Sequence, residues 1–427
     1  MGNQNILYEY NDIKNTLSAE DSKALELFLE SQKLNNVLKI SPTKIKAQNF
    51  VGVIKYKKHQ FEILPKFLAK DGEGRTGILK NLFYMLSYTK RLEVKDTDTA
   101  KLATSNNPFL EVLIGIFAES LYGNLLRFVP KNYILQEENL PYLKGKLKFR
   151  ENIRYNSVNK ARFYCEYDEF SEDNFLNRMF VYVTTMLSKI SSSEHNRKRL
   201  KQILNILSEV SFEAITSQQV KNFKLNRNQL YYEKAFKLAK MFIENSSVDM
   251  SSNKFKTIAI VWDMNELFEE FIFRFMRKNK DKIGCLDVED KKIKRLFHAP
   301  TNLFDESAEF KYKVGKTELD ILVSLSDEKK IIFDAKYKLH DGEKNYFSNA
   351  DMYQMITYES IHNTEEAVLI YPQTTEDDFL WKHRLNTDKD SENRIIYSTC
   401  IDLRKDLKTN NDKLIGQLIR IITKLKD

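Results

Sequence analysis

The runs Glu318-Leu319-Asp320-Ile321-Leu322-Val323 and Ile331-Ile332-Phe333-Asp334-Ala335-Lys336-Tyr337 decide the fold of the last part of this chain. Both are rich in β-branched residues and leucine, and the short segment between them is polar, so they predict two adjacent strands joined by a tight turn. Such a pair brings Asp320 and Asp334 together on one sheet. Lys336 shares the face of Asp334 because strand side chains alternate with a period of two. We therefore expect two carboxylates and an ammonium to converge beside a buried strand.

This trio predicts a site for a hard divalent cation. Asp320 and Asp334 are the expected metal ligands, because Mg²⁺ and Mn²⁺ bind through one or two carboxylates together with water and substrate phosphate. The chemistry that uses such a trio is metal-dependent phosphodiester hydrolysis, in which Lys336 orients the attacking water or holds a phosphate oxygen. An acid-x-Lys pattern also arises by chance, and the alternative is a solvated strand end with a surface ion pair.

A helix predicted over residues 349–358 adds two further candidates. Gln354 and Tyr358 are four residues apart and share a face of this helix. The alternative is an ordinary amphipathic helix that packs Tyr358 into a core. On an earlier helix, Glu269 is either a metal or supporting carboxylate, or one acid among several on an exposed face.

The order of these features resembles the PD-(D/E)xK nuclease superfamily. Asp320 and Asp334-Ala335-Lys336 match its pattern, although Leu319 stands where that pattern often has proline. The Gln354-x-x-x-Tyr358 helix that follows is similar to the RecB-like branch of the superfamily. The resemblance implies an α/β nuclease core at the C-terminal end of the chain.

Composition indicates a soluble globular protein. The chain has 427 residues, 42% hydrophobic and 30% charged, which is enough for two or three domains with their own cores. A net charge of +8 is compatible with a polyanionic partner. The cysteines Cys165, Cys285 and Cys400 are scattered and suggest no disulfide framework, so we expect a reducing cytoplasm. No apolar run approaches the roughly 18 residues of a membrane helix, so no membrane association is expected.

The chain is predicted to be an α+β multidomain protein divided at residues 1–165, 166–250 and 251–427. The first region is a mixed, β-rich and helical partner-binding region, and the second is helical. A linker is expected over 245–253, where Ser and Asn are frequent. Residues 165–178 are expected to lead into a long helix. From residue 254 the expected order is a helix to about 278, a strand over 293–298, the two motif strands, the 349–358 helix and a strand over 367–371.

Two basic segments are candidates for contact with a nucleic-acid backbone. The first contains Lys55, Lys57, Lys58 and Lys66 with nearby aromatic residues, and its alternative is the solvent face of a small β-domain. The second is the run 143–150, which is equally well explained as an edge strand protected from aggregation by lysine.

Several blocks, in order, resemble McrC, the nuclease subunit of McrBC restriction systems. The resemblance implies that Asp320, Asp334 and Lys336 are nuclease residues. It also implies that the N-terminal half docks onto a hexameric McrB-like AAA+ GTPase, stimulates its GTP hydrolysis and is carried along double-stranded DNA. The blocks are VGVI at 51–54, FEILPK at 61–66, LFYMLSY at 82–88, LKGKL at 143–147, CEYDEFSEDN at 165–174, LNR at 176–178, LFE at 267–269, DAKY at 334–337 and DMYQM at 351–355, with Asp320 and Tyr358.

The sequence thus favours a Mg²⁺- or Mn²⁺-dependent DNA endonuclease subunit of a 5-methylcytosine-directed restriction complex acting in phage defence. GTP is expected to bind the partner, because the only candidate phosphate loop here, at Gly315-Lys316-Thr317, has Phe310 where its first glycine should be. Two alternatives remain open. One is a catalytically silent adaptor of an AAA+ partner, and the other is a stand-alone nuclease of the same fold.

Overall fold

The computed structural model describes residues 4–67, 74–89, 92, 108–249, 254–290, 292–295, 316–326, 329–338, 348–374, 378–385 and 394–426. They form two compact units. The first unit contains the described residues of 53–60 and 107–260, and the second contains those of 4–52, 61–106 and 261–427. Within these ranges, no helix combines the length and the apolar character that crossing a membrane requires.

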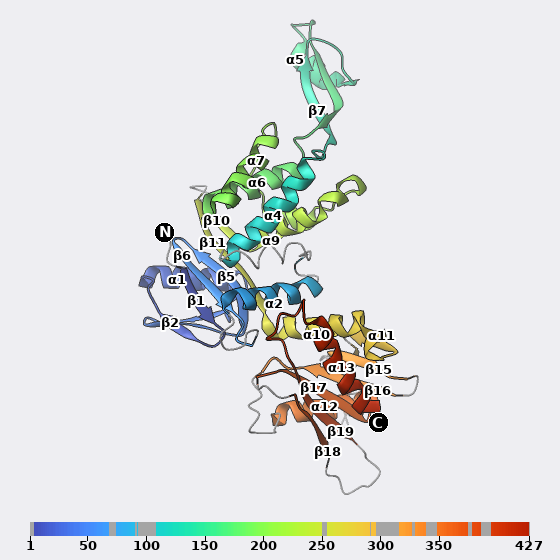
Figure 1. The fold of residues 1–427 in the computed structure, drawn as a ribbon. Helices are drawn as coiled ribbons and strands as arrows, with labels where there is room; N and C mark the ends of the chain where they lie inside the picture. The colour runs from blue at the N-terminus through green and yellow to red at the C-terminus, as the bar shows by residue number, and fades with distance from the viewer. Residues whose placement is uncertain are drawn as a thin grey trace, which may run out of the picture. The chain divides into compact units, whose positions relative to one another are not determined.

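A six-stranded mixed sheet forms the core of the second unit (Figure 1). Its first three strands are antiparallel, the next two continue parallel to the third, and the last is antiparallel. The central strands are almost continuously apolar and buried, as expected for strands covered on both faces. In sheet order the strands are β12 (Asp287–Asp290), β15 (Ile321–Ser324), β16 (Lys330–Ala335), β17 (Glu366–Pro372), β19 (Ile395–Ile401) and β18 (Leu380–Arg384).

Four helices belong to the C-terminal part of this unit. One core cluster joins Met355 and Tyr358 of α12 to Leu322, Ile332 and Leu369 of the sheet. α10 buries a row of phenylalanines that recurs at helical spacing. The helices are α10 (Met264–Lys278), α11 (Lys280–Ile283), α12 (Asn349–His362) and α13 (Asn411–Lys426).

Further sheets lie outside the six-stranded one. Nearer the C-terminus of the chain, β13 (Ile293–Arg295) pairs with β14 (Lys316–Glu318). In the N-terminal part, the sheet β2-β4-β3 contains β2 (Asp12–Lys14), β4 (Lys44–Ala47) and β3 (Leu38–Ile40), and two helices, α1 (Ala19–Ser31) and α2 (Arg75–Tyr88), accompany it. A five-stranded sheet has the order β1 (Gln4–Tyr8), β6 (His59–Leu64), β5 (Phe50–Tyr56), β11 (Lys254–Asp263) and β10 (Ser246–Asp249).

The first unit contains a helical group and a small β module. A buried carboxylate, Glu111, accepts hydrogen bonds from Ser192 N and Asn196 Nδ2 near the start of one helix of the group. The helices are α4 (Phe109–Leu125), α6 (Phe175–Ile190), α7 (Glu194–Ile206), α8 (Ser217–Asn222), α9 (Glu233–Glu244) and the 3₁₀ turn η1 (Arg227–Tyr232).

The β7–β9 module comprises β7 (Asn132–Leu140), β8 (Lys146–Leu147), β9 (Phe163–Ser171) and α5 (Phe149–Asn156) (Figure 1). β9 is its central strand. Gly145 has φ +67°, and a Cβ there would lie 2.4 Å from the carbonyl oxygen of Glu166, so the turn before β8 requires glycine.

Several local expectations from the sequence are wrong. Residues 254–263 form strand β11 rather than the first turns of α10, since Phe255, Ile258 and Ile260 lie in a β-branched run that favours a strand. The expected linker contains strand β10. The long helix expected after residues 165–178 is present as α6, and strand β9 precedes it. Lys316 and Thr317, which belong to the segment considered and rejected as a phosphate loop, lie in strand β14; Phe310 and Gly315 lie outside the described residues. The division of the chain at residues 165 and 250 stays a prediction.

Candidate functional site

The strand register places Asp320 beside Asp334. Ile321 pairs with Phe333 in the antiparallel ladder, so the residue before Ile321 lies across from the residue after Phe333. The Oδ2 atom of Asp320 accepts a hydrogen bond from the backbone N–H of Ala335 at 3.2 Å. The two carboxylates are close enough for each to change the pKa of the other. The convergence expected from the sequence is therefore present.

Lys336 completes the trio. Its Nζ lies 2.7 Å from Asp334 Oδ2, and the two side chains are 18% and 0% exposed. The backbone N–H of Lys336 donates to Ile370 O at 2.9 Å, which continues the pairing of β16 with β17 by one residue. Because Asp334 is fully buried, this ion pair is unlike the solvated strand end considered as the alternative.

Burial governs the electrostatics of the trio. It raises the pKa of Asp320 to about 8, with further increases from Asp334 and Glu269 that Lys336 partly opposes. Burial also raises the pKa of Asp334. For Lys336, burial lowers the pKa, but the ion pair with Asp334 outweighs it and the pKa of Lys336 is raised. Burial penalises the charged form of both acids, and a bound divalent cation would offset that penalty.

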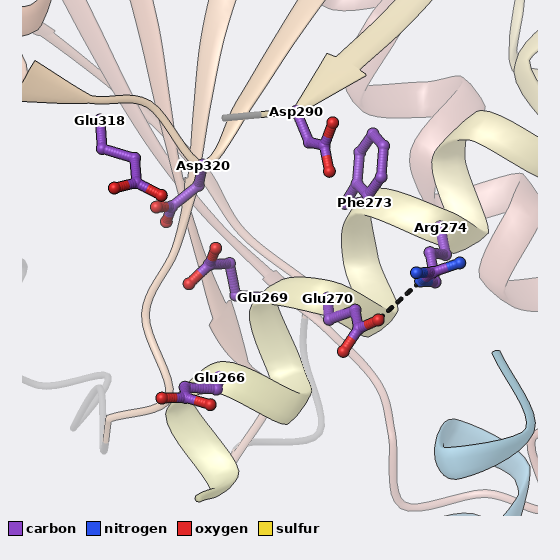
Figure 2. A pocket seen from close by; sticks show the side chains of 8 residues that line it. All are labelled: Glu266, Glu269, Glu270, Phe273, Arg274, Asp290, Glu318 and Asp320. Atoms are coloured by element: carbon purple, nitrogen blue, oxygen red, sulfur yellow. Dashed lines mark hydrogen bonds and ion pairs between the residues drawn. The ribbon is translucent and has the colours of Figure 1, made fainter. Parts of the chain in front are cut away.

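An open, acidic pocket of about 500 Å³ lies beside Asp320 (Figure 2). Figure 2 shows Glu269, from α10, pointing toward Asp320 and Glu318. On the same helix, Glu270 forms an ion pair with Arg274 at 2.8 Å. The pocket is lined by Glu266, Glu269, Glu270, Phe273, Arg274, Asp290, Glu318 and Asp320. The structure thus brings Glu269 to the predicted site, where it adds negative potential.

Gln354 and Tyr358 are linked to the site by a hydrogen bond to the backbone of Glu318. Gln354 Nε2 donates to Tyr358 Oη at 2.7 Å, and Tyr358 Oη donates to the carbonyl oxygen of Glu318 at 2.9 Å. Glu318 is two residues before Asp320, so this chain of hydrogen bonds fixes the backbone that leads into the metal-ligand candidate. Tyr358 also packs in the α12 core cluster, so the core interpretation of this residue is correct as well.

Sequence reasoning missed three supporting features. Lys338 and Ser348 both hold Asp351, with Lys338 Nζ 2.8 Å from Asp351 Oδ1, at the start of α12. Glu318 lines the pocket, and its spacing of two from Asp320 was a usable signal. The third feature is a buried hydrogen bond between Tyr337 and Glu9, which no local sequence pattern indicates.

The side chains of the site supply only some of the ligands that a magnesium ion needs. In the part of the chain that the structure describes, no three His, Cys, Asp or Glu side chains are grouped as a ready-made metal cluster. Mg²⁺ nevertheless keeps several waters and takes only one or two carboxylates with substrate phosphate. Asp320 and Asp334 provide that number, and their oxygen chemistry suits Mg²⁺ or Mn²⁺.

Comparison with known proteins agrees with the likeness found in the sequence. Residues 45–372 match the family model described as McrBC 5-methylcytosine restriction system component. The chain is 23% identical over 323 residues, 72% of this chain and 88% of the relative, to the type IV methyl-directed restriction enzyme EcoKMcrBC of Escherichia coli strain K12.

Solved structures show the same fold. One is a chain of the half-complex from a tetradecameric assembly of Thermococcus gammatolerans McrB AAA+ hexamers with bound McrC, with a TM-score of 0.76, 20% identity, and coverage of 99% of this chain and 100% of that one. Another, in the Thermococcus gammatolerans McrBC complex, has a TM-score of 0.53 at 24% identity and covers 65% of this chain and 88% of that one. The family model spans well over half of the sequence, and the chain belongs to the McrBC 5-methylcytosine restriction system component family.

Proposed function

We propose that this chain is the metal-dependent DNA endonuclease subunit of a GTP-driven restriction complex directed at 5-methylcytosine, with a PD-(D/E)xK core. We further propose that it stimulates the GTPase of a McrB-like AAA+ hexamer. The observation that carries the nuclease assignment is the buried trio of Asp320, Asp334 and Lys336. Buried charges of this kind are expensive without a ligand, and an adaptor would have no use for them.

Each residue of the site has a distinct part in the proposed reaction. Asp320 and Asp334 would hold Mg²⁺ or Mn²⁺, which when bound would supply charge neutralisation at the scissile phosphate and lower the pKa of bound water. Lys336, fixed by Asp334, holds the attacking water or a phosphate oxygen. Glu269 supports the cation side of the pocket, and Gln354 with Tyr358 positions the strand that carries Asp320.

The pocket also sets the electrostatics of substrate entry. Most of the side chains that line it are carboxylates, which repel a sugar-phosphate backbone. Cations held at these carboxylates would offset that repulsion when double-stranded DNA approaches. The three cysteines are buried and free, which fits the reducing cytoplasm proposed for this activity.

The β7–β9 module supports the partner part of the proposal. Its surface carries Tyr133, Phe149, Ile153, Tyr155 and Val158 as exposed apolar side chains. Such a concentration of exposed apolar groups is typical of a protein-binding surface. We assign this surface to the AAA+ partner, because the solved chain with the same fold over 99% of this sequence belongs to an assembly of McrB hexamers with bound McrC.

The test is the pair Asp334→Asn and Asp334→Ala, assayed on 5-methylcytosine-containing DNA with the partner, GTP and Mg²⁺. The wild-type chain is expected to cleave, and both variants to lose cleavage while still stimulating GTP hydrolysis. The silent-adaptor alternative predicts no metal-dependent cleavage by the wild type. The stand-alone alternative predicts efficient cleavage without partner or GTP, and either result would overturn the proposal.

A further inference from the structure

Glu9 is a buried carboxylate that contacts Tyr337, although the two residues are far apart in the sequence. It follows strand β1 and is fully buried. Its Oε2 accepts a hydrogen bond from Tyr337 Oη at 2.8 Å and another from the backbone N–H of Lys66 at 3.0 Å. All of these residues belong to the second unit. A buried acid is tolerated only where such partners compensate its lost hydration, so this contact is specific.

The side chain of Tyr337 is buried among aromatic residues. The centroid of its ring lies 5.1 Å from that of Phe67, in an edge arrangement, and 5.8 Å from that of Phe268 of α10. It is 2% exposed. Tyr337 follows Lys336 directly and lies two residues after the end of β16. Its enclosure therefore restrains the backbone next to the residue that supplies the ammonium.

In the described part of the chain, the backbone pairing of this strand ends close to Lys336. On the β15 side the ladder stops at Phe333, and on the β17 side the last backbone bond is made by the N–H of Lys336. Beyond that point the backbone turns, since Lys338 N–H donates back to Lys336 O. The hydrogen bond of Tyr337 to Glu9, together with its ring contacts with Phe67 and Phe268, holds the residue after Lys336 in place.

We propose that Glu9 and Tyr337 are positioning residues for Lys336: their buried hydrogen bond fixes the backbone from which the ammonium reaches Asp334. This inference rests on the proposed nuclease function. A group held in productive geometry loses rate steeply when it moves, on the order of 100-fold for a displacement of about 1 Å. The contact also makes cleavage depend on the N-terminal strand that supplies Glu9.

Glu62 provides a matched control. It lies on β6, is also fully buried, and forms a two-point ion pair with Arg75 at 2.8 and 3.0 Å. Replacing it disturbs a buried carboxylate of the same sheet as β1. Glu9→Gln is the conservative variant, because burial raises the pKa of Glu9 to about 8 and a neutral amide resembles the protonated acid. The amide oxygen accepts the same two hydrogen bonds.

The experiment uses the full chain with its partner, GTP, Mg²⁺ and modified DNA. Tyr337→Phe and Glu9→Ala are expected to lower the maximal cleavage rate by about 10- to 100-fold. The DNA concentration for half-maximal rate and the stimulated GTPase should stay unchanged. Glu9→Gln should stay within about threefold of wild type, and Glu62→Gln should match Glu9→Gln rather than Glu9→Ala. Wild-type cleavage rates in both Tyr337→Phe and Glu9→Ala would overturn the inference. A cleavage rate of Glu62→Gln that falls as far as that of Glu9→Ala would overturn it too.

A second measurement does not need cleavage. Amine acetylation followed by mass spectrometry reports the accessibility of Lys336, with Lys338 as an internal reference, because their side chains are 18% and 51% exposed. Tyr337→Phe and Glu9→Ala should label faster at Lys336 alone. If the wild type does not cleave but this labelling rises, the nuclease proposal fails and the positioning role stands. If the wild type cleaves and neither rate nor labelling changes, the positioning role fails alone.

Discussion

The strand ends of the second unit and the β7–β9 module of the first break the usual distribution of side chains in opposite ways. At the strand ends, Asp334 is fully buried, although carboxylates normally face water. In the module, Tyr133 is 74% and Val158 97% exposed, although such groups normally pack inside. Each arrangement costs stability by itself, and the proposed function gives each a ligand: a cation and phosphate at the first place, and a protein surface at the second.

The largest expected effect is on the charged side of this comparison. Lys336→Met removes the ammonium from Asp334 but keeps most of the side-chain volume. We expect cleavage to fall by about 1,000-fold, because a fixed charge beside the reacting phosphate is lost. Partner binding and stimulated GTP hydrolysis should remain, and both are measured in the same reaction. A variant that cleaves within tenfold of wild type would remove Lys336 from the site.

The exposed side of the comparison predicts a smaller effect with the opposite selectivity. The double variant Phe149→Ser/Val158→Ser changes residues that are 72% and 97% exposed, so the melting temperature of the isolated chain should hardly change. Affinity for the AAA+ partner should fall by about 100-fold, as for two interface anchors. Titration of GTPase stimulation measures it.

Leu27→Ser is the matched control, since Leu27 is 56% exposed on α1 of the other unit. It should leave partner affinity at the wild-type value. Equal losses in the control and in the double variant would show that the module is not the docking surface.

The two regions also differ in how far the sequence predicts them. Asp320, Asp334 and Lys336 were predictable because strand alternation and one tight turn relate them locally. The exposure of Phe149 and Val158 was not predictable, since α5 and its neighbours alternate polar and apolar residues as buried segments do. The contact of Glu9 with Tyr337 spans 328 positions of the chain, and no local pattern encodes it. Strand β11 was mistaken for helix because its run adjoins a strong helical pattern that begins at Met264.

Metal and pH should distinguish the buried acids from a purely structural pair. Burial raises the pKa of Asp320 from 3.8 to about 8, so the stability it contributes to the metal-free chain is complete below pH 3.8 and is lost as pH rises through about 8. Asp320→Asn removes this loss. The metal-free melting temperature of the variant, relative to wild type, should therefore increase between pH 6 and pH 9.

Mg²⁺ or Mn²⁺ should instead raise the melting temperature of the wild type relative to that of Asp320→Asn. An ion at 100 times its Kd stabilises the wild type by about 2.7 kcal/mol, more at pH 8 than at pH 6 because it competes with protons, and should leave Asp320→Asn unchanged. Melting curves with and without the ion measure both effects. Equal stabilisation of the two proteins would place the ion elsewhere.

The smallest expected effect concerns the hydroxyl of Tyr358. Tyr358→Phe keeps the ring in the α12 core cluster but removes the hydrogen bond to the Glu318 carbonyl and the acceptor of Gln354. Loss of each of these two bonds should cost about 1 kcal/mol of unfolding free energy. If the hydroxyl positions the strand leading to Asp320, cleavage should fall by more than stability does, and Mn²⁺ affinity should weaken with it. If Tyr358 serves only the core, denaturant melts will shift while the cleavage rate and Mn²⁺ affinity of the folded variant stay at wild-type values. The charged strand ends would then rely on Asp334, Lys336 and the Tyr337 anchor alone.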